Sequence, residues 1–211
     1  MLLRQLISWV AGDVHSIIFP VSGAGLQLAL SHGPPNGEAQ LTIHHRRSLL
    51  EHLRGQLAVD WWGHHGIAHW ARVRANGLML ARDTGANRHV VELFAFFHDV
   101  RRINEYDDED HGARGGELAK RLRGRYFDAT DDEMDLLAYA CTHHSDGMTQ
   151  ADPTVLTCWD ADRLDLGRVG ITPNPKYLGT KAARTEASMA KANQRAEAWR
   201  DAFDERRRRQ A

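Results

Sequence analysis

Apolar side chains recur at helical spacing along most of the chain after residue 45. Leu49, Leu50, Leu53 and Leu57 share one face of a first predicted helix. Further helices are predicted from His69 to about Gly85, over 90–97 and 112–122, after the capping box Thr130-x-x-Glu133, over 155–166 up to Gly167, and from about 180 to 208. No convincing strand pattern interrupts this series. We therefore predict an all-α domain, a bundle of about six to seven helices.

The first 45 residues have a different pattern, in which glycines and prolines separate short apolar pieces. Apolar and polar residues alternate over 26–30 and again over 40–43, which is typical of a small hairpin or of segments in a poorly ordered extension. We divide the chain accordingly into an N-terminal extension (1–45), a helical domain (46–170) and a C-terminal part (171–211). The C-terminal part combines a proline-containing linker with a helix that ends in a basic tail.

The composition is that of a globular protein, with one domain and appendages or two small domains. Of 211 residues, 42% are hydrophobic and 26% are charged, which excludes wholesale disorder. No window approaches 18 uninterrupted apolar residues, so we expect no transmembrane helix. The net charge of −1 argues against nucleic acid as a partner, and the basic run Arg206 to Arg209 is more typical of a solvated helix end than of a phosphate contact. Cys141 and Cys158 lack C-x-x-C spacing, so we expect reduced thiols in a cytoplasmic protein. The sequence is compatible with a homo-oligomer as well as with a monomer.

Polar side chains interrupt the most apolar of the predicted helices. The run 90–97 is apolar nearly all round, so we expect it at the centre of the bundle, and His98 and Asp99 continue it. A buried carboxylate or imidazole costs free energy unless a partner satisfies it. Pairing of Asp99 with Arg101 or Arg102 would satisfy it, and so would a divalent cation.

Further candidate ligands decide between these two interpretations. The chain has 13 histidines, and histidine is the commonest metal ligand. His65 and His69 are four residues apart and share a helix face if the second helix begins that early. In the sequence of predicted helix 155–166, at least one of Asp160, Asp162 and Asp165 should point inward. The remaining candidates are His111, His143 and His144. Histidines and carboxylates that interrupt the apolar faces of several helices indicate a metal site inside the bundle.

His69, the pair His98-Asp99 and Asp162 resemble the H…HD…D signature of the HD-domain metal-dependent phosphohydrolase superfamily. The resemblance covers roughly residues 46–170, and the order and separation of the fragments make the combination specific. It implies an HD-domain-like bundle in which these four side chains bind one divalent metal ion.

The resemblance favours Asp162 over Asp160 as the last ligand, because a basic residue and a hydrophobe follow it, Arg163-Leu164. A donor set of two histidines and two aspartates suits a metal of borderline or hard character. The metal could be Mn, Fe, Co, Ni, Zn or Mg, and possible arrangements include two ions.

The resemblance also implies roles for side chains around the four ligands. In branches that hold two metals, histidines between the HD pair and the last aspartate bind the second ion, and His111 with His143 or His144 stand at comparable places. They would otherwise act as general acids. No Gly-Tyr-Pro follows His143-His144, so the HD-GYP branch is not assigned. His65 is predicted to lie behind the ligands or to shuttle a proton.

Arg102 and Arg163 are predicted to contact phosphate, because a guanidinium suits bidentate contact with phosphate oxygens. Alternatively, each of the two arginines forms an ion pair with the acidic run 107–110 at the surface. The predicted activity is hydrolysis of a small phosphorylated substrate, a nucleotide or a phosphomonoester, by a metal-activated water.

Two rival functions remain at this point. The same ligand order could hold two irons in an oxygenase with this fold, or the domain could bind a nucleotide and regulate a partner without catalysis. Readings as a serine hydrolase or a P-loop protein have no support, since the chain has no G-x-S-x-G and no G-K-[ST].

Overall fold

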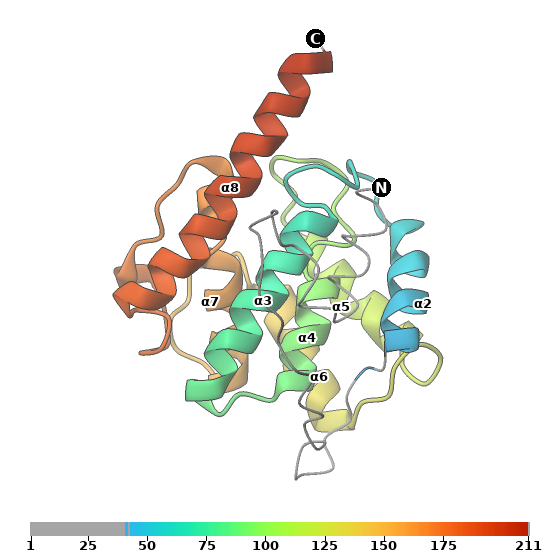
Figure 1. Cartoon of the computed structure of the whole chain (residues 1–211). Helices are drawn as coiled ribbons and strands as arrows, with labels where there is room; N and C mark the ends of the chain where they lie inside the picture. The colour runs from blue at the N-terminus through green and yellow to red at the C-terminus, as the bar shows by residue number, and fades with distance from the viewer. Residues whose placement is uncertain (1–40, 42, 211) are drawn as a thin grey trace, which may run out of the picture.

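The computed structural model describes residue 41 and residues 43–210, and the regular secondary structure of this part of the chain is helical (Figure 1). It contains seven α-helices and two short 3₁₀ helices, and the described residues form no β-strand. The helices are α2 (Ile43–Arg54), α3 (Ile67–Thr84), α4 (Arg88–Phe97), α5 (His111–Leu122), α6 (Asp131–His143), α7 (Pro153–Arg163) and α8 (Glu186–Gln210), with η1 (Leu166–Val169) and η2 (Pro175–Tyr177) before α8. The all-α prediction is confirmed. The predicted hairpin or extension in 1–45 lies, apart from its last residues, outside the described part.

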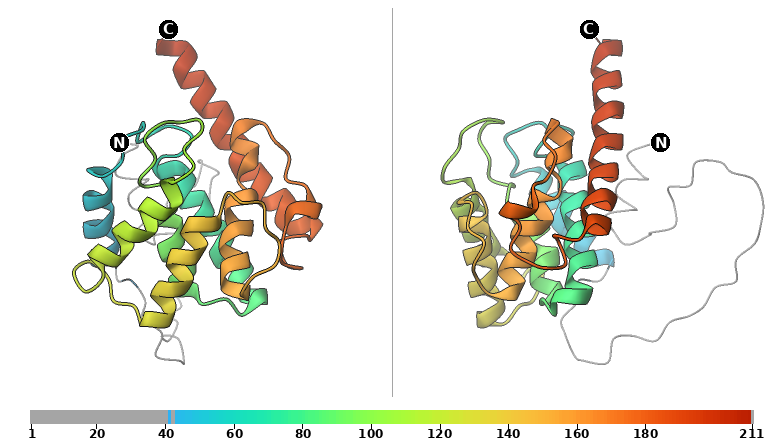
Figure 2. Two further views of the ribbon diagram at one scale, coloured as in Figure 1. Left: turned by 180° about the vertical axis from the view of Figure 1, so that it is seen from behind. Right: turned by 90° about the vertical axis from the view of Figure 1, so that its left-hand side faces the viewer.

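Helix α4 occupies the centre of the bundle, as its apolar sequence predicts. Residues 89–97 are all buried, and α3, α5, α6 and α7 pack around the helix (Figures 1 and 2). Asn87 begins it by accepting hydrogen bonds from the backbone N–H groups of His89 and Val90, which would otherwise lack partners. The polar residues that follow α4 are therefore placed in the interior of the protein.

His98 and Asp99 lie just past the end of α4 and not within it, which corrects the prediction. The helix ends at Phe97, and both the backbone N–H and the ring Nδ1 of His98 lie within hydrogen-bond distance of the Phe94 carbonyl oxygen. Because a carbonyl oxygen has two lone pairs, that of Phe94 can accept a hydrogen bond from each of these two groups.

The C-terminal part differs from the prediction because of Asp160. Its buried carboxylate accepts hydrogen bonds from the backbone N–H groups of Gly179 and Thr180 and from the Thr180 hydroxyl, at 2.7–2.8 Å. These bonds hold the chain around 179–180 in an irregular conformation, so α8 begins at Glu186 and not near 180.

Other helix ends also differ from their predicted positions. Helix α7 ends at Arg163 instead of 166, and α2 ends at Arg54, so Leu57 follows the helix and packs against the core from a loop. Thr130 and Glu133 form the predicted capping box at the start of α6.

Helix α8 packs on α3 and η1 as far as Trp199 and Arg200, and its last turns extend past the bundle (Figures 1 and 2). Cys141 and Cys158 are buried and form no disulfide. Among the described helices, none combines the length and the apolar character needed to cross a membrane.

Candidate metal centre

Six side chains from five parts of the bundle meet at the C-terminal end of α4. His69 belongs to α3, His98 and Asp99 follow α4, His111 begins α5, His144 follows α6, and Asp162 belongs to α7. We call this group the histidine–aspartate cluster. All its members except Asp162 are buried.

Two glycines allow α5 to approach the other helices closely enough to bring His111 into the cluster. A Cβ atom at Gly112 would lie 2.0 Å from the Cys141 carbonyl oxygen, and one at Gly115 would lie 2.1 Å from that of Phe97. Any larger side chain would push α5 away from the ends of α6 and α4.

Each imidazole of the cluster is oriented by a hydrogen bond at its Nδ1 atom. His98 and His144 donate to the carbonyl oxygens of Phe94 and Cys141 at 3.1 and 2.7 Å. His69 donates to Asp165 Oδ2 at 2.7 Å, and His111 donates to the Asp108 carbonyl oxygen. Because Nδ1 carries the proton in each case, a neutral ring presents the lone pair of its Nε2 atom to the centre. This orientation from outside is typical of histidines that bind metals.

Asp99 lies between two pairs of these histidines. The Nε2 atoms of His69 and His98 are 3.0 Å apart, and each is 3.3 Å from Asp99 Oδ2. The Nε2 atoms of His111 and His144 are 2.9 Å apart, at 3.2 and 3.7 Å from Asp99 Oδ1. We call His69, His98, Asp99 and Asp162 the first ligand set, and Asp99, His111 and His144 the second.

These distances fit metal coordination. Two nitrogen ligands about 2.1 Å from one ion, at a right angle to each other, stand about 3.0 Å apart. Two neutral imidazoles at that distance would oppose their lone pairs, so each pair needs a proton or a cation. Ligand atoms of His69, His98 and Asp99 all lie within 4.8 Å of one another, and so do those of Asp99, His111 and His144. Imidazole and carboxylate are donor types that divalent transition metals accept.

The pKa shifts within the histidine–aspartate cluster indicate that its centre favours a positive charge. Burial lowers the pKa of His69, but hydrogen bonds with three carboxylates outweigh burial and raise the pKa to about 9. Burial lowers the pKa of His98. Burial alone would raise the pKa of Asp99, but the imidazoles around it hold that pKa well below its usual range. The cluster therefore keeps Asp99 ionised and binds a proton on His69, at the position where a cation would supply the same charge.

Asp162 is the member of the cluster that solvent can reach. Its Oδ1 atom lies 3.3 Å from His69 Nε2 and 4.0 Å from His98 Nε2. Its side chain is 18% exposed, whereas the other side chains of the cluster are 0–4% exposed. A substrate would approach the first ligand set from this side.

The structure separates the two neighbouring histidines at the end of α6. His144 belongs to the cluster, whereas His143 points to the surface, where its Nδ1 lies 2.7 Å from Asp146 Oδ2. His143 is therefore not a member of the cluster, although the sequence left both residues open as candidates.

His65 lies in the turn before α3, because α3 begins only at Ile67, yet it remains close to the cluster. Its ring centroid is 6.2 Å from that of His69, and its Nδ1 contacts the carboxylate of Glu105. This pair sits beside the first ligand set, at a place suited to proton exchange.

The two arginines predicted to contact phosphate already have partners within the protein. Arg102 Nη1 donates to His111 Nε2 at 3.0 Å and to Asp99 Oδ1 at 3.4 Å, and Nη2 donates to the Tyr106 carbonyl oxygen. Its guanidinium thus lies against the second ligand set. Arg163 lies outside the cluster, because it donates to the Tyr177 carbonyl oxygen and packs over the Trp159 ring.

Three charged residues beside the first ligand set were missed by the sequence analysis as site residues. The Asp165 carboxylate accepts a hydrogen bond from His69 Nδ1 at Oδ2. It also accepts two hydrogen bonds from the Arg72 guanidinium, at 2.6 and 3.0 Å. Arg168 donates to the His64 and Asp165 carbonyl oxygens. The spacing of Asp162 and Asp165, three residues apart, was the available signal, since such residues lie on the same side of a helical turn.

Replacing Asp165 with asparagine is expected to lower metal affinity by roughly 10–100-fold, because the change weakens the bond that orients His69. Titration calorimetry with Mn²⁺ or Co²⁺ measures the affinity. Asparagine keeps the side-chain volume next to Arg72, so thermal unfolding can establish that the variant is folded. A folded variant with unchanged affinity would show that Asp165 does not position the ligand.

A family model described as "HD domain" matches residues 66–167, which include every member of the histidine–aspartate cluster. The search of curated proteins gave no match. The search of solved structures gave none either.

Proposed function

Residues 66–167 form an HD domain, and from this premise we propose that the protein hydrolyses a phosphate ester with a metal-activated water. HD domains indicate a superfamily of metal-dependent hydrolases. The observation that carries the proposal is the convergence of four oriented Nε2 atoms on the carboxylate of Asp99. The substrate is a nucleotide or another small phosphomonoester.

The first ligand set is the proposed site of the metal. A divalent ion bound there would lower the pKa of a coordinated water and polarise the phosphate group. His69, His98, Asp99 and Asp162 would hold it, and the exposed edge at Asp162 would admit the substrate. The second ligand set would hold a second ion only if the Arg102 guanidinium left His111 and Asp99.

The residues around this set have defined tasks in the proposed reaction. Asp165 keeps the Nε2 atom of His69 directed inward. The oxygen of the water bonds to phosphorus as the ester P–O bond breaks, and the leaving oxygen takes up a proton. His65, with Glu105 at its Nδ1 atom, is the side chain proposed to exchange that proton with solvent.

The experiment is metal analysis of the purified protein followed by a phosphate-release assay over nucleotides and p-nitrophenyl phosphate. We expect turnover with added Mn²⁺ or Co²⁺ and its loss after chelation. Colour and O₂ consumption by iron-loaded protein, without phosphate release, would favour the oxygenase. Tight nucleotide binding without any turnover would favour the regulatory domain.

A further inference from the structure

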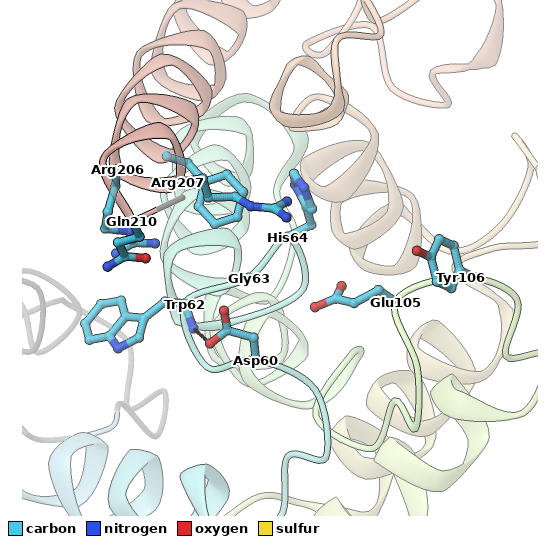
Figure 3. A pocket seen from close by; sticks show the side chains of 10 residues that line it. Asp60, Trp62, Gly63, His64, Glu105, Tyr106, Arg206, Arg207 and Gln210 are labelled. Atoms are coloured by element: carbon cyan, nitrogen blue, oxygen red, sulfur yellow. Dashed lines mark hydrogen bonds between the residues drawn. The ribbon is translucent and has the colours of Figure 1, made fainter.

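A cavity of about 640 Å³ lies beside the histidine–aspartate cluster, within the size range of small-molecule sites. Its walls come from the loop before α3, the loop after Asp99 and the last turns of α8 (Figure 3). The residues that matter here are Asp60, Trp62, Glu105, Phe203, Arg206 and Arg207. Of these six, only Glu105 lies within residues 66–167, so the cavity is built largely outside the matched domain.

Glu105 links this cavity to the histidine–aspartate cluster. It lines the cavity, and its Oε2 atom contacts Nδ1 of His65. The ring of His65 in turn lies 6.2 Å from the ring of His69 in the first ligand set. A substrate whose phosphate ester lay at the metal could therefore extend past His65 and Glu105 into the cavity.

Two arginines of the cavity make no ion pair with another described residue. Arg206 and Arg207 lie over the Phe203 ring, at 5.4 and 5.8 Å from its centroid. Within residues 43–210, neither guanidinium has a hydrogen bond or an ion pair, whereas Arg209 on the same helix pairs with Glu205. Guanidinium groups are suited to bind an anion such as a phosphate group.

Two carboxylates, those of Asp60 and Glu105, also line the cavity, and each has a hydrogen-bond partner. Asp60 Oδ1 accepts a hydrogen bond from the backbone N–H of Trp62 at 2.9 Å, and Glu105 is paired with His65. In Figure 3 the Trp62 indole stands next to Arg206 and Gln210, whereas the guanidinium of Arg207 points toward His64. A base can stack on an aromatic ring of this kind whatever the identity of the base.

We propose that this cavity binds the part of a nucleotide that is not hydrolysed. A second phosphate group lies against Arg206 and Arg207, and the base lies against Trp62. The inference rests on the proposed function for the role of the metal, and it narrows the substrate to a nucleotide with more than one phosphate. It also gives the basic end of α8 a function, whereas the sequence pattern favoured a solvated tail.

The test compares two double variants of the full-length protein. Arg206→Ala/Arg207→Ala removes the cavity arginines, and Arg208→Ala/Arg209→Ala removes the same charge from the same helix without touching the cavity. Binding of ADP and GDP is measured by calorimetry on metal-depleted protein, so that contacts between metal and phosphate do not contribute. The first variant should weaken binding at least about tenfold and the second less than about twofold. Trp62→Leu should also weaken binding about tenfold.

Each remaining outcome overturns the proposal. Failure of the unaltered protein to bind ADP or GDP does so, and so does an equal effect of the two double variants, which would indicate general attraction to a basic helix. The proposed function is tested separately by turnover of p-nitrophenyl phosphate by the unaltered, metal-loaded protein. Turnover without the expected binding pattern rejects only the proposal that the cavity binds a nucleotide. The binding pattern without turnover rejects only the proposal that the protein is a hydrolase.

Discussion

Replacing Asp99 with alanine is expected to abolish metal binding and phosphate release while the helical bundle persists. Asp99 is the one side chain that contacts the Nε2 atoms of both histidine pairs among the described residues, with one carboxylate oxygen facing each pair. Its loss removes a ligand and the negative charge that balances the cation. We expect kcat to fall by at least about a thousandfold, which corresponds to roughly 4 kcal/mol.

Metal content after dialysis and phosphate release measure these two losses, and circular dichroism measures the helix content. Asp146→Ala is the matched control, because it removes a carboxylate that pairs with His143 at the surface. It should leave metal content and turnover unchanged. Turnover by a metal-depleted Asp99→Ala protein would refute the metal mechanism.

The second large effect separates two aspartates that stand two residues apart on α7. Asp162 belongs to the first ligand set, whereas Asp160 binds the backbone at Gly179 and Thr180. Asp162→Ala should weaken metal binding by more than the roughly 10–100-fold that loss of an outer partner costs, and turnover should fall with it.

Asp160→Ala should instead act on stability. It leaves two buried backbone N–H groups and the Thr180 hydroxyl without their acceptor, at a cost of about 2–4 kcal/mol. We expect the Tm to fall by on the order of 5–15 °C, while metal affinity measured well below the Tm stays within about twofold. Exchanged outcomes, with metal binding lost in Asp160→Ala and kept in Asp162→Ala, would mean that the last ligand is assigned to the wrong aspartate.

Local periodicity was sufficient to predict the helices in the described part of the chain. The apolar runs and the Thr130–Glu133 capping box act over a few residues, so they can be read without knowledge of distant contacts. Helix ends were harder to predict. Gly179 and Thr180 are kept out of α8 by a carboxylate about twenty residues away, and no local pattern records that bond.

The candidate ligands could be selected from the sequence because buried imidazoles and carboxylates are costly, and therefore stand out in apolar helices. The sequence could not show which of these side chains lie together in the folded protein. His143 and His144 are adjacent in the chain, but the rotation of about 100° between neighbouring helical residues sends one to the surface and the other to Asp99.

The sequence by itself determined the helical class and a short set of possible metal ligands. Only the tertiary structure decided that Asp99 stands between two histidine pairs, that Asp165 orients His69, and that the end of α8 faces a cavity. The physical reason is range: helix formation depends on neighbours three or four residues apart, whereas a site depends on side chains up to a hundred residues apart that packing brings within a few ångströms.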